Sequence, residues 1–215
     1  MNGVPTTRWL GRLSYAQGLD LQEELVAGKI SGDGQDHLLL LEHDPVYTIG
    51  RNRDESSLGD ENNLPYPVHR TNRGGQATYH GPGQLVCYPI LDLNLRGRDL
   101  HLYLRFLEEV IIDILAEHAV KARRRDGLTG VWVADRKIAS IGIGVRRWIT
   151  MHGFALNVAG ELPGFDSITP CGLEGVMMTS LSRECGRETA VEIVAKIAAE
   201  VFVRKLEELR EGRFS

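Results

Sequence analysis

Residues 69–93 read HRTNRGGQATYHGPGQLVCYPILDL, a polar, glycine-rich segment that runs directly into an apolar strand. Four glycines, at positions 74, 75, 81 and 83, lie among two histidines and two arginines. Glycine lets the backbone approach a ligand closely or adopt positive φ, and the donors from Arg73 to His80 would surround that space. The alternative is a long, solvated hairpin connection, because glycine-rich loops are common on protein surfaces. Packing alone does not require this mixture, so the segment is the first candidate site.

The sequence before this segment predicts one helix and one strand. Arg8 to Lys29 has the apolar spacing of an amphipathic helix. His37 to Ile49 reads as a buried strand of leucines that ends at a turn marked by Asp44-Pro45. The polar stretch from Arg51 to Pro67 is predicted to be a loop.

The sequence after it completes an α+β pattern. Asp99 is the predicted N-cap of a helix over 100–115, whose apolar residues recur at three-to-four spacing. Residues 131–158 are β-rich, with a predicted hairpin turn at Asp135-Arg136. A last helix is expected from Thr189 to Leu206. This order predicts an α+β fold with a mixed β-sheet flanked by helices.

Composition excludes several classes of protein. The chain has 215 residues, 42% hydrophobic and 25% charged, which suits one sizeable core and predicts a single domain over 1–215. Its net charge of -4 lacks the basic footprint of a nucleic-acid-binding domain. No basic N-terminal region precedes an apolar run, and no window reaches the apolar length of a membrane span. We therefore expect a cytoplasmic protein that binds neither nucleic acid nor membrane.

The three cysteines, at positions 87, 171 and 185, form no CxxC pair and predict neither a disulfide scaffold nor a zinc site. Cys171 lies between Pro170 and Gly172, in a turn where a thiolate nucleophile would be accessible. The Gly172 N–H is expected to be free to donate to an oxyanion. The alternative is a small buried hydrophobe, which suits Cys87 better because it lies inside an apolar strand. Cys185 lies in a polar turn and has no evident role.

Two residues are candidate partners for this thiol. Lys137 directly precedes an apolar, glycine-spaced strand, which predicts partial burial. A partly desolvated ammonium can pair with a thiolate or carry a proton, although most lysines simply face water. His152 is the alternative base, and it would give a Cys-His hydrolase or transferase. The residues alone leave both possibilities open.

Residues 73–88, RGGQATYHGPGQLVCY, resemble the signature of the lipoyl(octanoyl) transferases, which move octanoyl groups from a carrier protein to a protein lysine. Three further stretches agree with this family in order and spacing: residues 130–133, residues 137–142 with 147–157, and residues 168–172. The likeness covers nearly the whole chain. It implies the fold of the biotin and lipoate ligase catalytic domain.

The resemblance also implies the site and its substrates. Cys171 is expected to form an acyl-thioester, with Lys137 favouring its thiolate form and handling protons. Acyl-chain contacts are expected from Arg73, Gly74, Gly75, Gln76, Ala77, Thr78, Tyr79 and His80, from Ser140, Ile141 and Gly142, and from Gly153, Phe154 and Ala155. The implied donor is octanoyl-acyl carrier protein, and the implied acceptors are lipoyl domains of 2-oxoacid dehydrogenase complexes and the glycine cleavage H protein. A monomer without cofactor or metal is expected.

Three alternatives remain beside this reading. An ATP-dependent lipoate-protein ligase or biotin ligase would share the fold but would need no nucleophilic thiol at Cys171. A Cys-His hydrolase would use His80 or His152 as base and water as acceptor. A non-catalytic module would bind acyl carriers without turnover. Arg123-Arg124-Arg125 and Arg146-Arg147 are candidate contacts for an acidic carrier protein, with solvated charge as their alternative.

Overall fold

The computed structural model describes residues 3–32, 34–51, 55–173 and 175–210, and a seven-stranded sheet forms its centre. In spatial order the strands are β1 (Thr6–Leu13), β2 (His37–His43), β6 (Gln84–Ile90), β10 (Ile149–Asn157), β9 (Arg136–Arg146), β8 (Leu128–Val133) and β7 (Arg123–Arg125). β1 runs parallel to β2, and each of the other neighbouring pairs is antiparallel. The predicted mixed sheet is confirmed.

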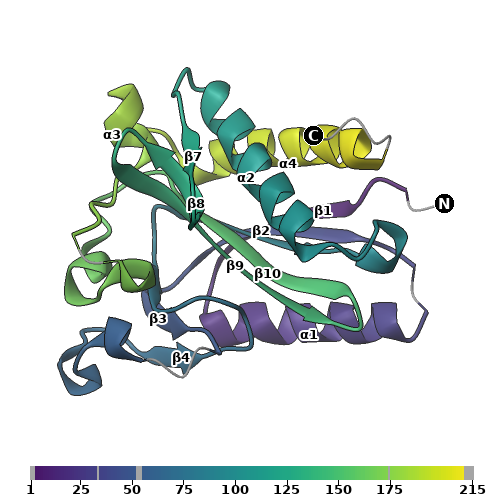
Figure 1. Cartoon of the computed structure of the whole chain (residues 1–215), viewed down its shortest axis with the longest axis horizontal. Coiled ribbons are helices and arrows are strands. Elements are labelled where there is room, and N and C mark those ends of the chain that lie inside the picture. Colours follow the sequence, from purple (N-terminus) through teal and green to yellow (C-terminus); the bar gives the residue numbers. More distant parts are fainter. Residues whose placement is uncertain (1–2, 33, 52–54, 174, 211–215) are drawn as a thin grey trace.

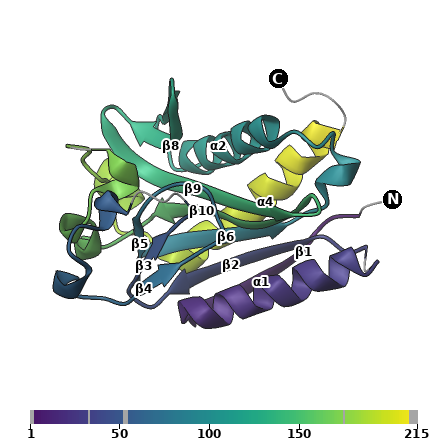
Figure 2. The same ribbon diagram turned by 60° about the horizontal axis from the view of Figure 1, so that its bottom comes forward.

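Helices cover both faces of this sheet (Figures 1 and 2). α1 (Tyr15–Ile30) lies on one face, and α2 (Leu100–Ala116) and α4 (Val191–Arg210) lie on the other. The leucines of β2 alternate between the two: Leu38 and Leu40 pack into the core with α2 and α4, whereas Leu39 and Leu41 face α1. Burial on both faces explains why β2 is apolar at successive positions.

A smaller sheet lies beside the first and contains β4 (Val68–Arg70), β3 (Val46–Ile49) and β5 (Thr78–His80) in that order. The predicted strand from His37 to Ile49 is thus two strands, because the chain leaves the large sheet at Asp44-Pro45. The aromatic rings of Tyr47, Tyr79 and Phe165 form a core under this small sheet. Short helical turns complete the chain: η1 (Ser56–Leu58), η2 (Glu61–Asn63), η3 (Leu93–Leu95), η4 (Pro163–Ser167), η5 (Pro170–Gly172) and α3 (Leu181–Cys185).

The first half of the predicted helix from Arg8 to Lys29 is wrong, because residues 6–13 form β1. Gly11 has φ 65 and the strand register shifts near it, which is compatible with an irregular edge strand and not with a helix. The helix begins after Ser14, whose side chain accepts from the Gln17 N–H while the Gln17 side chain accepts from the Ser14 N–H. This capping box sets the start of α1 at Tyr15.

The predictions for the second half of the chain are largely confirmed. The Asp99 side chain accepts from the Leu102 N–H and caps α2. The β8–β9 hairpin turns at Ala134-Asp135, one residue earlier than expected. Among the described residues, no helix has the length and apolar character to cross a bilayer.

Three buried charged residues form ion pairs at one end of the large sheet, and the candidate site lies at the other end. The Asp36 carboxylate, whose side chain is 1% exposed, lies 2.7 Å from Lys29 Nζ and 2.5 Å from an Arg96 terminal nitrogen. Lys29 comes from the last turn of α1, and Arg96 follows η3. One carboxylate therefore pairs with two buried cations from different elements.

Candidate active site

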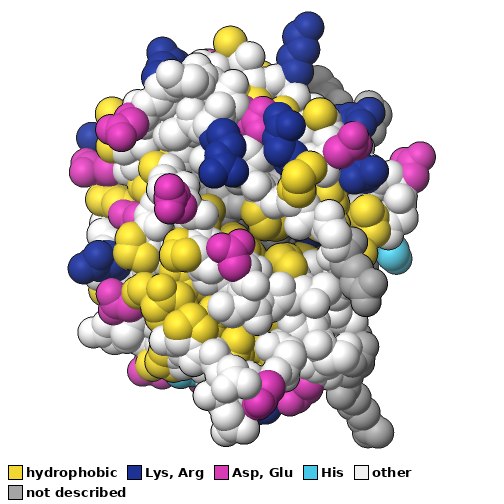
Figure 3. All heavy atoms as spheres, turned by 90° about the vertical axis from the view of Figure 1, so that its left-hand side faces the viewer, with side chains coloured by type: hydrophobic (Ala, Val, Ile, Leu, Met, Phe, Trp, Pro, Cys, Tyr) yellow, Lys and Arg dark blue, Asp and Glu magenta, His cyan; other side chains and the backbone are white. Residues whose placement is uncertain are grey.

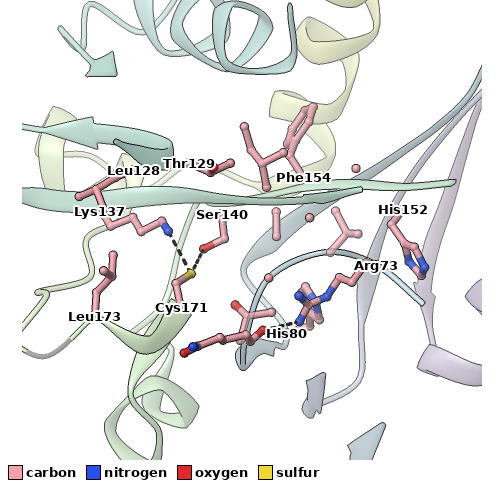
Figure 4. A pocket seen from close by; sticks show the side chains of 18 of the residues that line it. Arg73, His80, Leu128, Thr129, Lys137, Ser140, His152, Phe154, Cys171 and Leu173 are labelled. Atoms are coloured by element: carbon pink, nitrogen blue, oxygen red, sulfur yellow. Dashed lines mark hydrogen bonds between the residues drawn. The ribbon is translucent and has the colours of Figure 1, made fainter. Parts of the chain in front are cut away.

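A cavity of about 270 Å³ lies between the α1-facing side of the large sheet and the glycine-rich segment (Figure 4). Its walls combine residues from seven parts of the chain: Tyr15 of α1; Arg73, Gly75, Gln76, Thr78 and His80; Val86 and Tyr88 of β6; residues 127–129; Lys137 and residues 140–142 of β9; residues 152–155 of β10; and Cys171 with Leu173. Elements far apart in the sequence thus meet around one space.

Cys171 and Lys137 are in contact at one end of this cavity. Lys137 Nζ donates to Cys171 Sγ at 3.0 Å, and Ser140 Oγ lies 3.8 Å from the same sulfur (Figure 4). The Lys137 side chain is 1% exposed, and its ammonium lies 5.5 Å from the centre of the Trp132 ring. A cationic neighbour of this kind is typical of the surroundings of nucleophilic cysteines.

The backbone around Cys171 is held in a left-handed conformation, with φ 57 at Cys171 and φ 68 at Gly172. The Cys171 N–H donates to the Ala77 carbonyl at 2.9 Å, which ties the nucleophile's turn to the glycine-rich segment. A Cβ at Gly172 would lie 1.7 Å from Gln76 Oε1, so no larger residue fits there without movement. The glycine-rich segment therefore sets the position of the thiol.

The expectation that the Gly172 N–H is free for an oxyanion is wrong. It donates to the Thr169 carbonyl at 2.9 Å because residues 170–172 close a tight turn on Thr169. The groups that remain beside the sulfur are the Lys137 ammonium and the Ser140 hydroxyl. These two are the candidate donors to a developing negative charge.

Arg73 organises the glycine-rich segment from inside. Its guanidinium is buried and donates to the carbonyl oxygens of Thr48, Gly74 and Gln76 at 2.8 to 3.0 Å. Desolvation by burial lowers the pKa of Arg73. A Cβ at Gly142 would lie 2.9 Å from Arg73 Cδ, which explains the small residue on β9 at this point.

The structure places most, but not all, of the expected acyl-contact residues on the cavity wall. Those on the wall are Arg73, Gly75, Gln76, Thr78, His80, Ser140, Ile141, Gly142, Gly153, Phe154 and Ala155. Gly74 instead donates its N–H to the Ile143 carbonyl, and Ala77 holds Cys171. The Tyr79 ring points into the core of the small sheet, because residues alternate in direction along β5.

The two candidate histidine bases are held by other partners. His80 contacts Gln84 Oε1 at 2.7 Å and Thr48 Oγ1 at 3.3 Å, whereas His152 Nε2 contacts the Asn72 carboxamide oxygen. Burial lowers the pKa of His80 to about 3 and that of His152 to about 3, so both rings are neutral near pH 7. Figure 4 shows His152 at the end of the cavity away from Cys171. The geometry favours Lys137 as partner of the thiol.

Several wall residues carry no signal in the sequence. Tyr15 opens α1, and Val86 and Tyr88 lie on an ordinary apolar strand. Leu128 and Leu173 flank Lys137 and Cys171 at the mouth of the cavity (Figure 4). They were missed because only the packing of distant elements brings them together.

The other two cysteines lie in different surroundings. Cys87 is buried in the core against α2 and α4, and burial raises its pKa well above the usual range. Cys185 ends α3 and is half-buried, so its expected place in an exposed polar turn is wrong. In both cases packing explains the residue.

A groove outside the mouth leads to the cavity. Its apolar lining comes from the segment after β10, namely Leu162, Phe165, Ile168, Pro170, Leu173, Val176, Met177 and Met178. Leu173 lines both the groove and the cavity, so the two are adjacent. Figure 3 shows apolar side chains gathered beside a hollow on this side of the molecule, with charges of both signs around them.

The arginines considered for carrier docking lie in two different settings. Arg123 and Arg125 each approach Asp135 at 3.8 and 3.6 Å, and Arg124 pairs with Glu109. The Arg146-Arg147 turn lies nine residues along the chain from Lys137, which is about 30 Å at about 3.3 Å per strand residue. That turn is therefore remote along β9 from the Lys137–Cys171 contact.

Residues 14–203 match the family model of the lipoyl protein ligase A/B catalytic domain. An octanoyltransferase from Geobacter sulfurreducens is 54% identical over 191 residues, which are 88% of this chain and 80% of that protein. The chain belongs to the octanoyltransferase family. A second octanoyltransferase, from Geobacter metallireducens, is 51% identical over 201 residues, covering 94% of this chain and 93% of its own. As a family member the chain is an acyltransferase that moves octanoyl groups in protein lipoylation.

Solved structures confirm the predicted fold of the lipoate and biotin ligase catalytic domain. The archaeal lipoylation system of Thermoplasma acidophilum, a bi-partite lipoate protein ligase and its E2 lipoyl domain, matches with TM-score 0.71 at 16% identity, over 95% of this chain and 85% of that one. Biotin protein ligase from Aquifex aeolicus matches with TM-score 0.56 at 15% identity, over 97% of this chain and 72% of that one. At these identities the likeness concerns the fold alone.

Proposed function

We propose that the enzyme transfers an octanoyl group from octanoyl-acyl carrier protein to a lysine of a lipoyl domain through a Cys171 thioester. The observation that carries this proposal is the 3.0 Å contact between Lys137 Nζ and Cys171 Sγ at one end of the cavity. A covalent route needs an activated thiol beside an acyl-binding space, and this arrangement supplies both.

In the first half-reaction the Cys171 thiolate attacks the carbonyl carbon of the carrier thioester. The carbonyl oxygen becomes an oxyanion beside the Lys137 ammonium and the Ser140 hydroxyl, which lie close enough to the sulfur to stabilise it. The bond to the carrier sulfur then breaks, and that sulfur takes a proton from Lys137. The products are octanoyl-Cys171 and the free thiol of the carrier.

In the second half-reaction the neutral amine of an acceptor lysine attacks the same carbonyl. The C–N bond forms, the C–S bond breaks, and Cys171 leaves as thiolate, while the amine proton passes to neutral Lys137. This restores the ammonium–thiolate pair. Thioester exchange is nearly balanced and amide formation is downhill, so transfer needs no nucleotide, cofactor or metal.

The cavity suits a medium-length saturated chain. Val86, Ile141, Phe154 and Ala155 provide apolar wall beyond the thiol, and a volume of about 270 Å³ limits the occupant. Methylenes buried there at about 0.8 kcal/mol each would contribute about 5 kcal/mol for an octanoyl chain. We assign the predicted substrate-binding role to the residues that line this wall.

The partners follow from the chemistry and from the relatives. The T. acidophilum ligase is described together with an E2 lipoyl domain, which supports a lipoyl domain as acceptor. As specific acceptors we propose lipoyl domains of 2-oxoacid dehydrogenase complexes and the glycine cleavage H protein. Both half-reactions use side chains of one chain, so we propose a monomer with one catalytic domain over residues 1–215. We also propose that the reaction takes place in the cytoplasm.

Intact mass spectrometry tests this proposal. Incubation with octanoyl-acyl carrier protein, without ATP, should add the mass of one octanoyl group to the enzyme, and peptide mapping should place it on Cys171. Cys171→Ala should acquire no label, whereas Cys185→Ser should label normally. Transfer that requires ATP and free octanoate, with full activity in Cys171→Ala, would instead support the ligase alternative.

A further inference from the structure

An irregularity in β9 allows Lys137 and Ser140 to reach the same sulfur. They are three residues apart, so in a regular strand their side chains would point to opposite faces. Both nevertheless contact Cys171, whereas the two residues between them, Ile138 and Ala139, both lie in the core under α2 and α4. Two consecutive residues on one face are the mark of a β-bulge.

The bulge is visible in the pairing of β8 with β9. Val131 pairs with Ala139 and Trp132 pairs with Lys137, so the register shifts by one residue between Val131 and Trp132. A bulge disrupts the ladder locally and re-aims the side chains beside it. Here it turns Lys137 out of the core face and toward the thiol.

Gly130 lies against the bulge and has a conformation that favours glycine, with φ 125. A Cβ at this position would lie 2.6 Å from the Ala139 oxygen, 2.8 Å from Lys137 Cε and 3.3 Å from Lys137 Nζ. The backbone of Gly130 therefore forms the surface on which the end of the Lys137 side chain rests. A shift of Gly130 would move the ammonium.

A side chain from α2 holds Gly130 in place. The Gly130 N–H donates to Glu108 Oε1 at 3.3 Å, across the core side of the sheet. Glu108 is 2% exposed, and its other oxygen pairs with Arg105 at 2.7 Å and Arg124 at 3.2 Å. A buried carboxylate on the apolar face of a helix is costly unless its partners compensate it.

We propose that Glu108 is a positioning residue for the Lys137–Cys171 pair. Its carboxylate accepts a hydrogen bond from the Gly130 N–H. This bond keeps the β8–β9 bulge in the conformation that directs Lys137 and Ser140 toward Cys171 Sγ. Glu108 touches neither the thiol nor the ammonium. This assignment rests on the proposed roles of Cys171 and Lys137, and it extends the active site through the sheet to α2.

A matched pair of variants separates this hydrogen bond from charge and packing. Glu108→Gln keeps an oxygen acceptor for Gly130 and removes the charge, whereas Glu108→Met keeps the length and removes both. Arg105 and Arg124 are 51% and 33% exposed and can turn to solvent in either variant. Glu109→Gln is the control, because Glu109 pairs with Arg124 but not with Gly130.

The readout is the rate of Cys171 alkylation by iodoacetamide at pH 7 and pH 9, in a Cys185→Ser background. It requires no acyl donor, so it is independent of the proposed substrates. Displacing the ammonium should slow alkylation at pH 7 by about tenfold in Glu108→Met, with a smaller loss at pH 9. Glu108→Gln and Glu109→Gln should stay within about threefold of the parent at both pH values.

Two outcomes would overturn the proposal. One is a Glu108→Met enzyme with a lower melting temperature but the parent pH dependence of alkylation, which would make Glu108 merely structural. The other is equal loss in Glu108→Gln and Glu108→Met, which would assign the effect to charge. If Glu108→Met does not fold, Glu108→Leu removes the same acceptor with a different side-chain shape and should give the same selective loss at pH 7.

Discussion

Replacing Lys137 by methionine removes the ammonium beside Cys171 and keeps most of the volume of the side chain. The stem of Lys137 packs on Gly130 and lies near the Trp132 ring, and a methionine can retain those contacts. Loss of charge is therefore the main change. Acyl-enzyme formation should slow strongly at pH 7 and recover in part at pH 9, where hydroxide ionises the thiol.

The expected size follows from the geometry. Opposite unit charges 3.0 Å apart attract by about 5.5 kcal/mol at an effective dielectric constant of about 20. Desolvation of the buried ammonium offsets part of this attraction. Opposite charges at such distances typically change ionisation equilibria in proteins by about ten- to thousandfold. The rate of acyl-enzyme formation at pH 7 should fall by about ten- to thirtyfold, because a thiol of ordinary pKa is already about 3% thiolate at pH 7 and the gain cannot exceed full ionisation.

The assay is single-turnover acyl-enzyme formation, followed by quench and intact mass, with iodoacetamide alkylation of Cys171 as a donor-independent companion. A Cys185→Ser background removes the half-buried competing thiol, and Cys87 is 1% exposed. Equal slowing of Lys137→Met at pH 7 and pH 9 would refute the electrostatic reasoning. Lys137 would then act in proton transfer or in positioning alone.

Other changes have expected outcomes of different kinds. Gly172→Ala should reduce the rate of transfer more than tenfold, because the added Cβ would clash with the Gln76 side chain. Adding Gln76→Ala to this variant should restore part of the rate, and a double variant as slow as Gly172→Ala would contradict the predicted clash. Asp36→Asn should lower the free energy of unfolding by about 3 to 5 kcal/mol in urea titrations, because two buried cations lose their carboxylate. Asp44→Asn is the control: it removes an exposed ion pair with Arg12 and should lower the free energy of unfolding by less than about 1 kcal/mol. Burial lowers the pKa of His80 to about 3 in the folded chain, whereas its pKa in the unfolded chain is about 6.5. Between these two pH values only the unfolded chain binds the proton, so the free energy of unfolding should fall as the pH decreases from about 6.5 to about 3. Between pH 6 and pH 5, the plot of the free energy of unfolding against pH should be shallower for His80→Gln than for the parent, by up to about 1.4 kcal/mol per pH unit. An unchanged slope would contradict a neutral buried ring.

Local signals in the sequence account well for single elements. The three-to-four apolar spacing after Asp99 predicts α2, and the cap contact is present. The same reasoning fails at residues 8–13, because pairing of β1 with the buried β2 outweighs an apolar spacing that also suits a helix. The error is one of long-range contact, which periodicity over a short window does not contain.

In the candidate site, local sequence signals likewise indicate some residues, whereas only long-range contacts reveal others. The glycine-rich segment stands out because its composition is unusual, and Cys171 stands out because proline and glycine flank it. Lys137 does not stand out by periodicity: the bulge at Ile138 and Ala139 breaks the alternation that would reveal a residue facing the cavity. Its candidacy came from its place directly before an apolar, glycine-spaced strand and its expected role from the family resemblance, whereas its contact with the thiol appears only in three dimensions.

The remaining features depend on packing between distant elements. Tyr15 reaches the cavity only because α1 lies under the sheet. The Gly172 N–H is occupied because its turn closes on Thr169, which the letters PCG do not reveal. The Glu108 contact joins a helix to a strand residue 22 positions later through the core. No local pattern encodes such contacts.

The most direct test of the covalent route is a chase of the isolated octanoyl-enzyme. Enzyme labelled by octanoyl-acyl carrier protein and freed of donor should be mixed with a lipoyl domain without ATP and sampled by rapid quench. We expect octanoyl to leave Cys171 and appear on one lysine of the domain, at a rate no slower than steady-state turnover. An acyl-enzyme that transfers more slowly than turnover, or loses its acyl group only to water, would contradict the account.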